Sequence, residues 1–148
     1  MLSGFEDFEV VEMQRLGKRT VLHSLLLHDI ESDDDVVRLV HTFYHYVQKD
    51  ERLNYIFNEF AGIDWDTHLP KMVDFWSNIL FRTGRYHGRP FRQHVPLPLK
   101  LKDFERWLGL FFNTVDLLFE GPHAEQVKQM AYNIASSFAS RLELLKEE

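Results

Sequence analysis

The sequence predicts an all-α protein, because apolar residues recur at helical spacing in four stretches and no strand pattern competes with them. Between the second and third of these stretches, residues 82–100 hold two glycines and three prolines, which no long helix tolerates. A length of 148 residues fits one domain, and 45% apolar with 27% charged residues suits a globular core.

The first helix is expected to begin at Ser32, a plausible N-cap. Three aspartates at 33–35 follow, in the turn where the helix dipole favours carboxylates. Its apolar face is predicted to consist of Val36, Val37, Val40, Phe43, Tyr44 and Val47. A charged stretch at 49–52 ends the helix, and residues 53–60 are expected to form a short apolar connector.

Asp64 or Asp66 is expected to cap the second helix, with Pro70 near its first turns. Two further helices are expected within residues 101–118 and 127–142, separated by Gly121 and Pro122. Between the second and third helices, residues 82–100 have room for one helical turn at most, between Pro90 and Pro96. A long irregular segment in a compact domain is usually functional.

Composition excludes several functions. The net charge is −6 and no basic stripe is evident, which argues against a nucleic-acid partner. The absence of cysteine excludes disulfides, thiolate catalysis, zinc ribbons and covalent c-type haem attachment. No apolar run reaches the roughly 18–20 residues of a membrane span, and the acidic N-terminus is unlike a secretory signal. We therefore expect a cytoplasmic protein, with residues 1–28 as an extension packed on or beside a domain at 29–148.

His94 is the strongest candidate for a metal ligand. It lies in the irregular segment, where Pro90, Pro96 and Pro98 restrict the backbone around it. A neutral imidazole is a good iron ligand, and a haem needs one protein nitrogen. By itself, a single histidine in a loop is most often an ordinary surface residue.

Several short stretches support the histidine when they are taken together and in order. They are Phe43-Tyr44, Ile56-Phe57-Asn58, Thr67-His68, Phe75-Trp76, Tyr86-His87-Gly88-Arg89-Pro90, His94 with Leu97-Pro98, and Trp107-Leu108. In this order, across roughly residues 30–142, the chain resembles the third group of truncated haemoglobins.

The resemblance implies a truncated globin fold, a two-over-two helical sandwich with an irregular proximal loop. It implies haem b as cofactor, with His94 as the proximal ligand of pentacoordinate iron and Phe57 against the porphyrin. On the distal side it implies Tyr44, His68 and Trp107, with Phe43 beside them. Met72, Phe75 and Tyr86 are expected to complete the apolar slot, and Lys71 and Arg92 are the first candidates to pair with the haem propionates.

The distal assignment also has a physical basis. Oxygen at a haem iron carries partial negative charge, and the Tyr, His and Trp side chains can each donate a hydrogen bond to it. Oxygen handling is one expected function. Nitric oxide dioxygenase or peroxidase-like chemistry is another, and it would require an unidentified reductase.

The ordinary interpretation of the same residues stays open. An aromatic stripe at helical spacing most often packs in an ordinary hydrophobic core. In a haem-free globin-like interaction or sensor module, these aromatic residues would have that role. His41 and His45 have the i, i+4 spacing of metal ligands, but they fall on the polar side of their helix. His28, His87 and His123 have no convincing partners and are expected on the surface.

Overall fold

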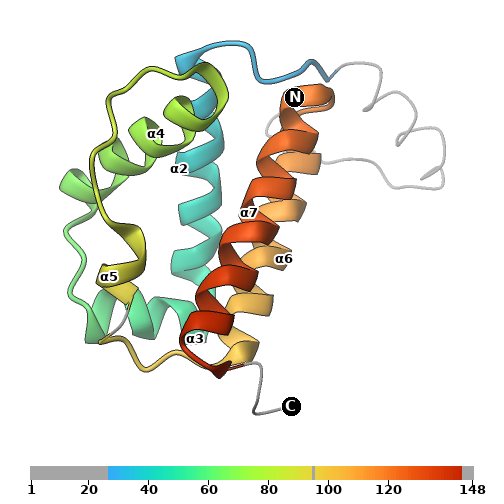
Figure 1. Ribbon diagram of the computed structural model, residues 1–148. Coiled ribbons are helices and arrows are strands. Elements are labelled where there is room, and N and C mark those ends of the chain that lie inside the picture. The colour runs from blue at the N-terminus through green and yellow to red at the C-terminus, as the bar shows by residue number, and fades with distance from the viewer. Residues whose placement is uncertain (1–26, 95, 145–148) are drawn as a thin grey trace, which may run out of the picture.

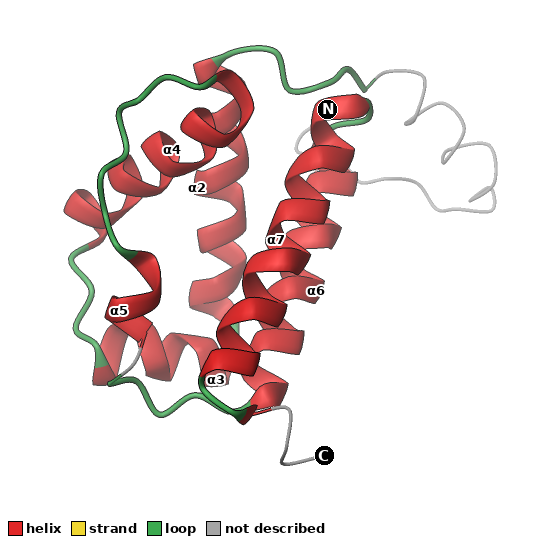
Figure 2. Ribbon diagram, in the orientation of Figure 1, coloured by secondary structure: helices red, strands yellow, loops and turns green. Residues whose placement is uncertain are grey.

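The computed structural model describes residues 27–94 and 96–144, and all regular structure in these residues is helical (Figure 2). The elements are α2 (Asp33–Lys49), α3 (Glu51–Asn54), the π-helical segment η1 (Tyr55–Phe60), α4 (Trp65–Phe81), α5 (Pro90–His94), α6 (Leu101–Leu118) and α7 (Pro122–Arg141). The all-α prediction is confirmed. Most of the predicted N-terminal extension, residues 1–26, lies outside the described residues.

The long helices form two pairs. A short connection joins α6 to α7, and the two helices run side by side in opposite directions (Figure 1). The second pair consists of α2 and α4, and α2 also packs against α6. The long segment between α4 and α6 passes outside these helices and carries α5 (Figure 1). This arrangement is the two-over-two sandwich that the sequence predicts.

The predicted caps begin α2 and α4. The Ser32 side chain accepts a hydrogen bond from the Asp35 backbone N–H at 3.3 Å. Asp64 is the cap of α4 and accepts from the backbone N–H of Asp66 at 3.2 Å. Each cap satisfies a backbone donor that the first helical turn leaves without a partner.

The prediction of an apolar connector at residues 53–60 is wrong, because this stretch is helical in α3 and η1. Asp50 ends α2 and at once caps α3, since its carboxylate accepts from the Leu53 N–H at 3.0 Å. The apolar positions Leu53 and Ile56 then turn inward and are almost completely buried. Asp50, which the sequence pattern placed at the end of one helix, thus also begins the next helix.

The segment between α4 and α6 has the form that its glycines and prolines predict. Arg82 ends α4 in the left-handed region, with a φ of 55°. The Asn78 side chain then accepts from the Gly84 N–H at 2.7 Å. One short helix, α5, begins at Pro90 and ends at His94, which confirms the single turn expected there.

An aromatic cluster joins α2, α4 and α6 in the core. The Phe111 ring stacks on Trp76 with 4.8 Å between ring centroids and on Trp107 with 5.7 Å. Phe43 packs edge-on against Phe111 and Trp107, at 5.1 and 5.6 Å. Aromatic pairs in these geometries add about 0.5–1.5 kcal/mol each beyond the area they bury.

The N-terminus of α7 is capped by a residue that is distant in sequence. Its own N-cap is Gly121, which has no side chain to offer. Instead the Asp29 carboxylate accepts from the backbone N–H groups of His123 and Ala124, both at 2.8 Å. Gly121 has a φ of 147°, and a Cβ there would lie 2.5 Å from Asp29 Cγ. The close approach therefore requires glycine. Among the described residues, no helix is both long and apolar enough to cross a membrane.

This cap predicts a stability effect. Replacing Asp29 with Ala leaves two α7 donors without their partner, so we expect the free energy of unfolding to fall by about 1–2 kcal/mol. Urea unfolding followed by circular dichroism measures the change. Asp34→Ala removes the same charge from the exposed first turn of α2 and is expected to cost about 0.3–1 kcal/mol. Equal losses in the two variants would contradict the capping role of Asp29.

Candidate functional site

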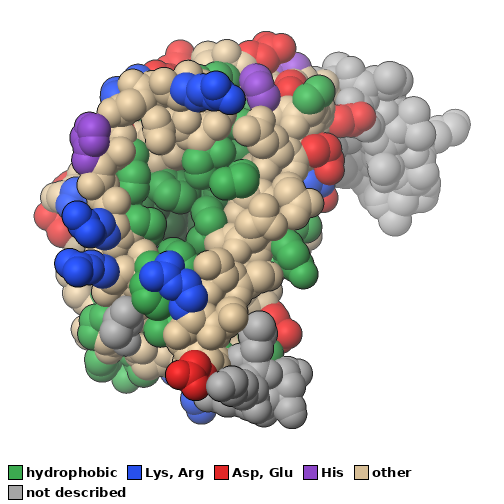
Figure 3. Space-filling model, viewed as in Figure 1, with side chains coloured by type: hydrophobic (Ala, Val, Ile, Leu, Met, Phe, Trp, Pro, Cys, Tyr) green, Lys and Arg blue, Asp and Glu red, His purple; other side chains and the backbone are tan. Residues whose placement is uncertain are grey.

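A deep cavity opens between the two helix pairs. Its volume is about 150 Å³, whereas one buried water needs roughly 10–15 Å³. Figure 3 shows the hollow, with hydrophobic side chains in its walls. The lining residues are Tyr44, Leu53, Ile56, Phe57, Ala61, Ile63, His68, Met72, Phe75, Trp76, Tyr86, Pro90, Gln93, His94, Leu97, Leu99, Asp103, Phe104, Trp107, Ile134, Ala135 and Phe138. Such a site suits a large apolar ligand that a few polar groups orient.

His94 enters the cavity wall from the end of α5. Its Nδ1 lies 2.6 Å from the carbonyl oxygen of Pro90. A carbonyl can only accept, so Nδ1 donates its proton and Nε2 keeps a free lone pair. The ring also packs against Phe138 of α7, with 5.0 Å between ring centroids. Burial lowers the pKa of His94, and the Pro90 hydrogen bond opposes that shift. The imidazole is thus oriented from two sides and favoured in its neutral form.

Three side chains with hydrogen-bond donors line the cavity from different helices: Tyr44 from α2, His68 from α4 and Trp107 from α6. Tyr44 and His68 pack edge-on with 5.5 Å between ring centroids. Burial raises the pKa of the Tyr44 hydroxyl far above its usual value, and an interaction with the Trp107 indole opposes the shift. Tyr44 therefore remains protonated and able to donate.

His68 has an unsatisfied ring nitrogen. Its Nε2 is buried and has no hydrogen-bond partner among the described residues. Burial lowers the pKa of His68, and its electrostatic interactions with Lys71 and His94 lower it further. A buried polar atom without a partner costs roughly 1–3 kcal/mol. In a cavity wall, such an atom marks a position where a ligand would supply the missing bond.

Of the eleven side chains assigned from the sequence, eight line the cavity: Tyr44, Phe57, His68, Met72, Phe75, Tyr86, His94 and Trp107. The other three do not line it. Phe43 is fully buried behind the wall, in the aromatic cluster, because its side of α2 faces Phe111 and Trp107. Lys71 and Arg92 are exposed at the surface.

Some site residues were missed by sequence reasoning. Trp65 packs on Tyr44 and His68 at 5.4 and 5.6 Å between ring centroids. It lies three residues before His68, so helical spacing was an available signal. Phe138 was assigned only to the apolar face of its helix, and no local signal connects it with His94, 44 residues earlier.

A partly buried ion pair lies beside the cavity, which Asp103 lines. The Asp103 carboxylate accepts two hydrogen bonds from the Arg52 guanidinium, at 2.9 and 3.0 Å. The same carboxylate accepts from the Lys100 backbone N–H at 2.9 Å and so caps α6. Arg52 also donates to the Pro98 carbonyl at 2.7 Å. The pair therefore ties α3 to the start of α6 and to the end of the irregular segment.

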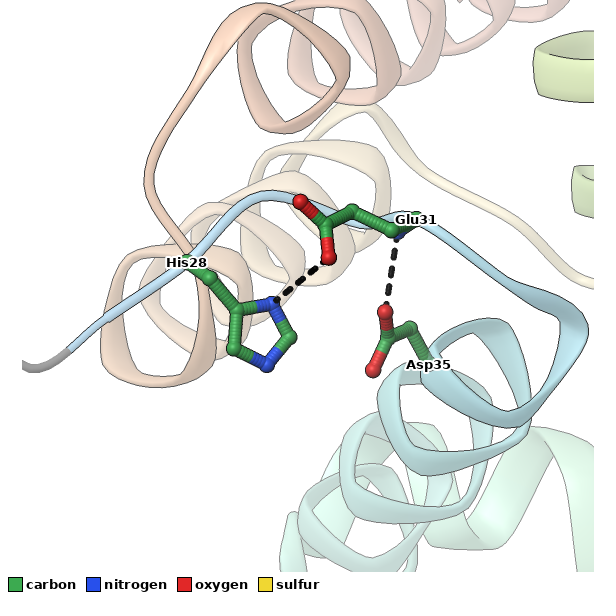
Figure 4. Close-up of side chains that lie close together, drawn as sticks. All are labelled: His28, Glu31 and Asp35. Carbon is green, nitrogen blue, oxygen red and sulfur yellow. Dashed lines mark hydrogen bonds and ion pairs between the residues drawn. The ribbon is translucent and has the colours of Figure 1, made fainter.

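A second group of polar side chains lies away from the cavity. The ligand atoms of His28, Glu31 and Asp35 all lie within 4.8 Å of one another (Figure 4). Asp35 accepts from the Glu31 backbone N–H at 2.9 Å, and His28 Nδ1 lies 2.6 Å from the Asp29 carbonyl. These contacts account for the grouping as local order at the start of α2.

The expectation that His123 is a surface residue without partners is wrong. Its Nδ1 lies 2.6 Å from the Ile30 carbonyl, and its ring packs edge-on against Phe81 at 5.5 Å. These contacts hold the segment before α2 against α7. His87 is exposed, as expected.

Two helix pairs around an aromatic cavity, with a histidine on one wall and donors on another, define a globin of the shortened, two-over-two type. The family model for bacterial-like globins matches residues 26–138. The group 3 truncated hemoglobin ctb of Campylobacter jejuni subsp. jejuni is 32% identical over 115 residues, which cover 75% of this chain and 91% of that protein. The crystal structure of group III truncated hemoglobin from Campylobacter jejuni gives a TM-score of 0.73 at 30% identity, covering 79% of this chain and 95% of that one.

The chain belongs to the bacterial-like globin family and, within it, to the third group of truncated haemoglobins. The resemblance inferred from the sequence is confirmed. Membership in this family carries a haem cofactor and a role as a haem globin.

The Arg52–Asp103 pair predicts a measurable contribution to stability. Asp103→Asn keeps the size of the side chain but removes its charge, so we expect a loss of about 1.5–3 kcal/mol in the free energy of unfolding. Urea unfolding measures it. Asp116→Asn is the matched control, because Asp116 is exposed and pairs with Lys128 at 2.7 Å, and it is expected to cost about 0–1 kcal/mol. Asp103 would not have the role described if both variants unfolded at the same urea concentration.

Proposed function

We propose that this protein binds haem b through His94 and holds oxygen or another diatomic ligand on the side of the cavity that Tyr44, His68 and Trp107 line. The observation that carries the proposal is the hydrogen bond from His94 Nδ1 to Pro90. Metal-ligating histidines characteristically donate their other ring N–H to a carbonyl or carboxylate, which fixes both tautomer and ring orientation.

The residues present fit the cofactor. A haem needs one neutral imidazole from the protein, and the lowered pKa of His94 keeps its ring in that form. The rest of the wall is mainly apolar and aromatic, as a porphyrin requires, with Phe57, Met72 and Phe75 in the lining. Tyr86 packs edge-on against Phe75 at 5.0 Å between ring centroids and completes this part of the slot.

Charged side chains near the cavity suit the two carboxylates of the cofactor. Lys71 is exposed on α4 and Arg92 is exposed on α5. We assign these two as the first partners of the propionates. Exposed pairs of this kind contribute roughly 0–1 kcal/mol each, so orientation of the cofactor matters more here than affinity.

When bound, haem supplies an iron atom that binds a diatomic ligand reversibly and accepts or gives up one electron. The protein then determines how firmly that ligand is held. The Tyr44 hydroxyl, the His68 imidazole and the Trp107 indole would donate hydrogen bonds to it, and the unsatisfied Nε2 of His68 supports this role. Tyr44 is buried, and His68 and Trp107 are partly buried, which limits competition from water.

Oxygen handling is one use of such a site, and nitric oxide or peroxide chemistry is the second candidate. Three converging donors favour the second, because they hold oxygen too firmly for efficient delivery and can polarise a bound peroxide. A haem-free interaction module is the contrasting alternative. Purified protein with no Soret band, even after incubation with haem, would establish that alternative.

The first functional prediction concerns the iron ligand. His94→Ala should abolish or disorder haem binding, since it removes the imidazole that the Pro90 carbonyl orients. The Soret band and the ferrous carbon monoxide spectrum measure the effect. His41→Ala and His45→Ala are matched controls on exposed positions and should retain haem, as should His68→Ala. A His94→Ala protein with full haem content and an unchanged ferrous spectrum would reject the assignment.

A further prediction concerns the release of oxygen. A hydrogen bond to a charged group contributes roughly 1.5–3 kcal/mol, and each 1.4 kcal/mol is about tenfold in an equilibrium constant. Tyr44→Phe and Trp107→Phe should therefore each speed oxygen dissociation by about ten- to a hundredfold. Carbon monoxide, being less polar when bound, should respond less, and His68→Leu should have a smaller effect than either.

Stopped-flow oxygen dissociation provides the measurement. Met72→Leu is the control, because it changes a lining side chain without removing a donor. The distal-donor assignment is wrong if neither Tyr44→Phe nor Trp107→Phe changes the rate by more than about twofold, even in a protein that binds haem normally.

A further inference from the structure

Positive charge is concentrated in one segment of the chain. Residues 82–102 contain six Lys and Arg residues and no Asp or Glu, namely Arg82, Arg85, Arg89, Arg92, Lys100 and Lys102. The chain has 17 such cations against 23 carboxylates, so the remainder has 11 against 23, a net of −12. The expectation that the sequence contains no basic stripe is therefore wrong. The overall charge of −6 conceals a segment of +6.

This segment is also a wall of the cavity. Tyr86, Pro90, His94, Leu97 and Leu99 all belong to it and all line the hollow. The six cations are interspersed among these lining residues or flank them, and all six are exposed. In Figure 3, Lys and Arg side chains lie around the hollow on the side of this segment, while several acidic side chains lie farther out. We call these six residues the basic rim.

Most of the basic rim has no ion-pair partner among the residues that the structure describes. Among the ion pairs of residues 27–94 and 96–144, Arg85 is the only member of the rim that takes part, with Asp33 at 3.0 Å and Asp74 at 3.1 Å. One haem carboxylate would cancel the charge of Arg92, whereas the other is assigned to Lys71, which is not part of the rim. A positive excess would remain on the segment that borders the cavity.

The geometry points to the basic rim as the docking surface for an acidic protein that carries a single electron, such as a flavin or iron–sulfur protein. This inference rests on the proposed function, because such a partner is useful only if the cavity holds haem iron. One electron would leave the reduced donor and convert ferric iron to ferrous iron. No bond forms or breaks in this step, and no proton must cross the interface.

Charge complementarity determines this choice of partner. At long range, the net negative charge of the molecule repels an acidic protein. Within a Debye length of about 8–10 Å, attraction to the positive rim would dominate. Steering of this kind raises association rates by about 10–10³-fold and orients the partner toward the cavity. Electron-transfer complexes are typically small and transient, which a rim of six cations can accommodate.

A nucleic acid is the competing polyanion, and the structure does not favour it. Beyond the rim, an extended phosphate backbone would meet the acidic start of α2, where Asp33 and Asp34 are exposed and Asp35 is half-buried. A compact acidic protein contacts the rim alone. Non-specific nucleic-acid binding also depends on many simultaneous phosphate contacts, which the flanking carboxylates oppose.

The test is a binding titration of the haem-containing protein with oxidised flavodoxin, an acidic flavoprotein, monitored by flavin fluorescence anisotropy. Net charge alone predicts that flavodoxin does not bind, whereas the basic rim predicts binding that weakens at least tenfold between about 10 mM and 500 mM salt. Arg89→Glu should weaken it by about three- to tenfold, and Arg89→Lys should retain it. Arg38→Glu is the matched control, because it makes the same change of charge on α2, where Arg38 lies over Phe119 rather than at the cavity.

Three results would overturn the proposal: no binding of flavodoxin at low salt, equal weakening by Arg89→Glu and Arg38→Glu, or tighter binding of a 12-base-pair DNA duplex than of flavodoxin. A second measurement follows reduction of the ferric protein by reduced flavodoxin and by dithionite. Arg89→Glu should slow the first reaction selectively, and equal slowing of both would also contradict the rim. Because the titration involves no electron transfer, its failure is distinct from a failure of the haem assignment, which the His94→Ala spectrum reports.

Discussion

The stacking of Phe111 between Trp76 and Trp107 is the interaction on which the rest of the structure depends. It joins α4 to α6, and Phe43 adds α2 to the same cluster. Aromatic side chains fill this side of the core, so the cavity forms on the other side of Trp76 and Trp107, whose rings also line it. The cluster therefore positions the Trp107 indole and, through Phe43, the neighbouring Tyr44. The same aromatic cluster thus packs the helices together and positions the donors Trp107 and Tyr44.

The opposite wall is built under a different constraint. Glycines and prolines prevent residues 82–100 from forming a long helix, so no continuous helical face covers the cavity there. The segment is held at particular points instead: Asn78 binds the Gly84 N–H, Pro90 binds His94, and Arg52 binds the Pro98 carbonyl. This wall combines apolar residues that line the cavity with cations that are exposed to solvent.

Sequence reasoning reached the parts of this structure that depend on local or periodic signals. The long helices, the caps Ser32 and Asp64, and the single turn before His94 all follow from spacing and capping chemistry. The features it missed depend on pairs that are distant in sequence. Asp29 caps a helix that begins 93 residues later, and Arg52 meets Asp103 across 51 residues. No local pattern indicates such partners. Residues 53–60 were misread because Asp50 acts for two helices at once.

Charge was misjudged for a related reason. The net charge of the chain is the sum of −12 outside residues 82–102 and +6 inside them. This sum of −6 is what an ordinary acidic protein would have. In the fold, this separation of charge along the chain becomes a separation in space, because the segment that carries the cations borders the cavity. The same prolines that keep this segment from burying its polar side chains in a helix interface leave its arginines in solvent. The irregular backbone of this segment thus places His94 in the cavity wall and the basic rim in solvent. The ligand site and the positive charge beside it therefore both depend on the composition of one segment.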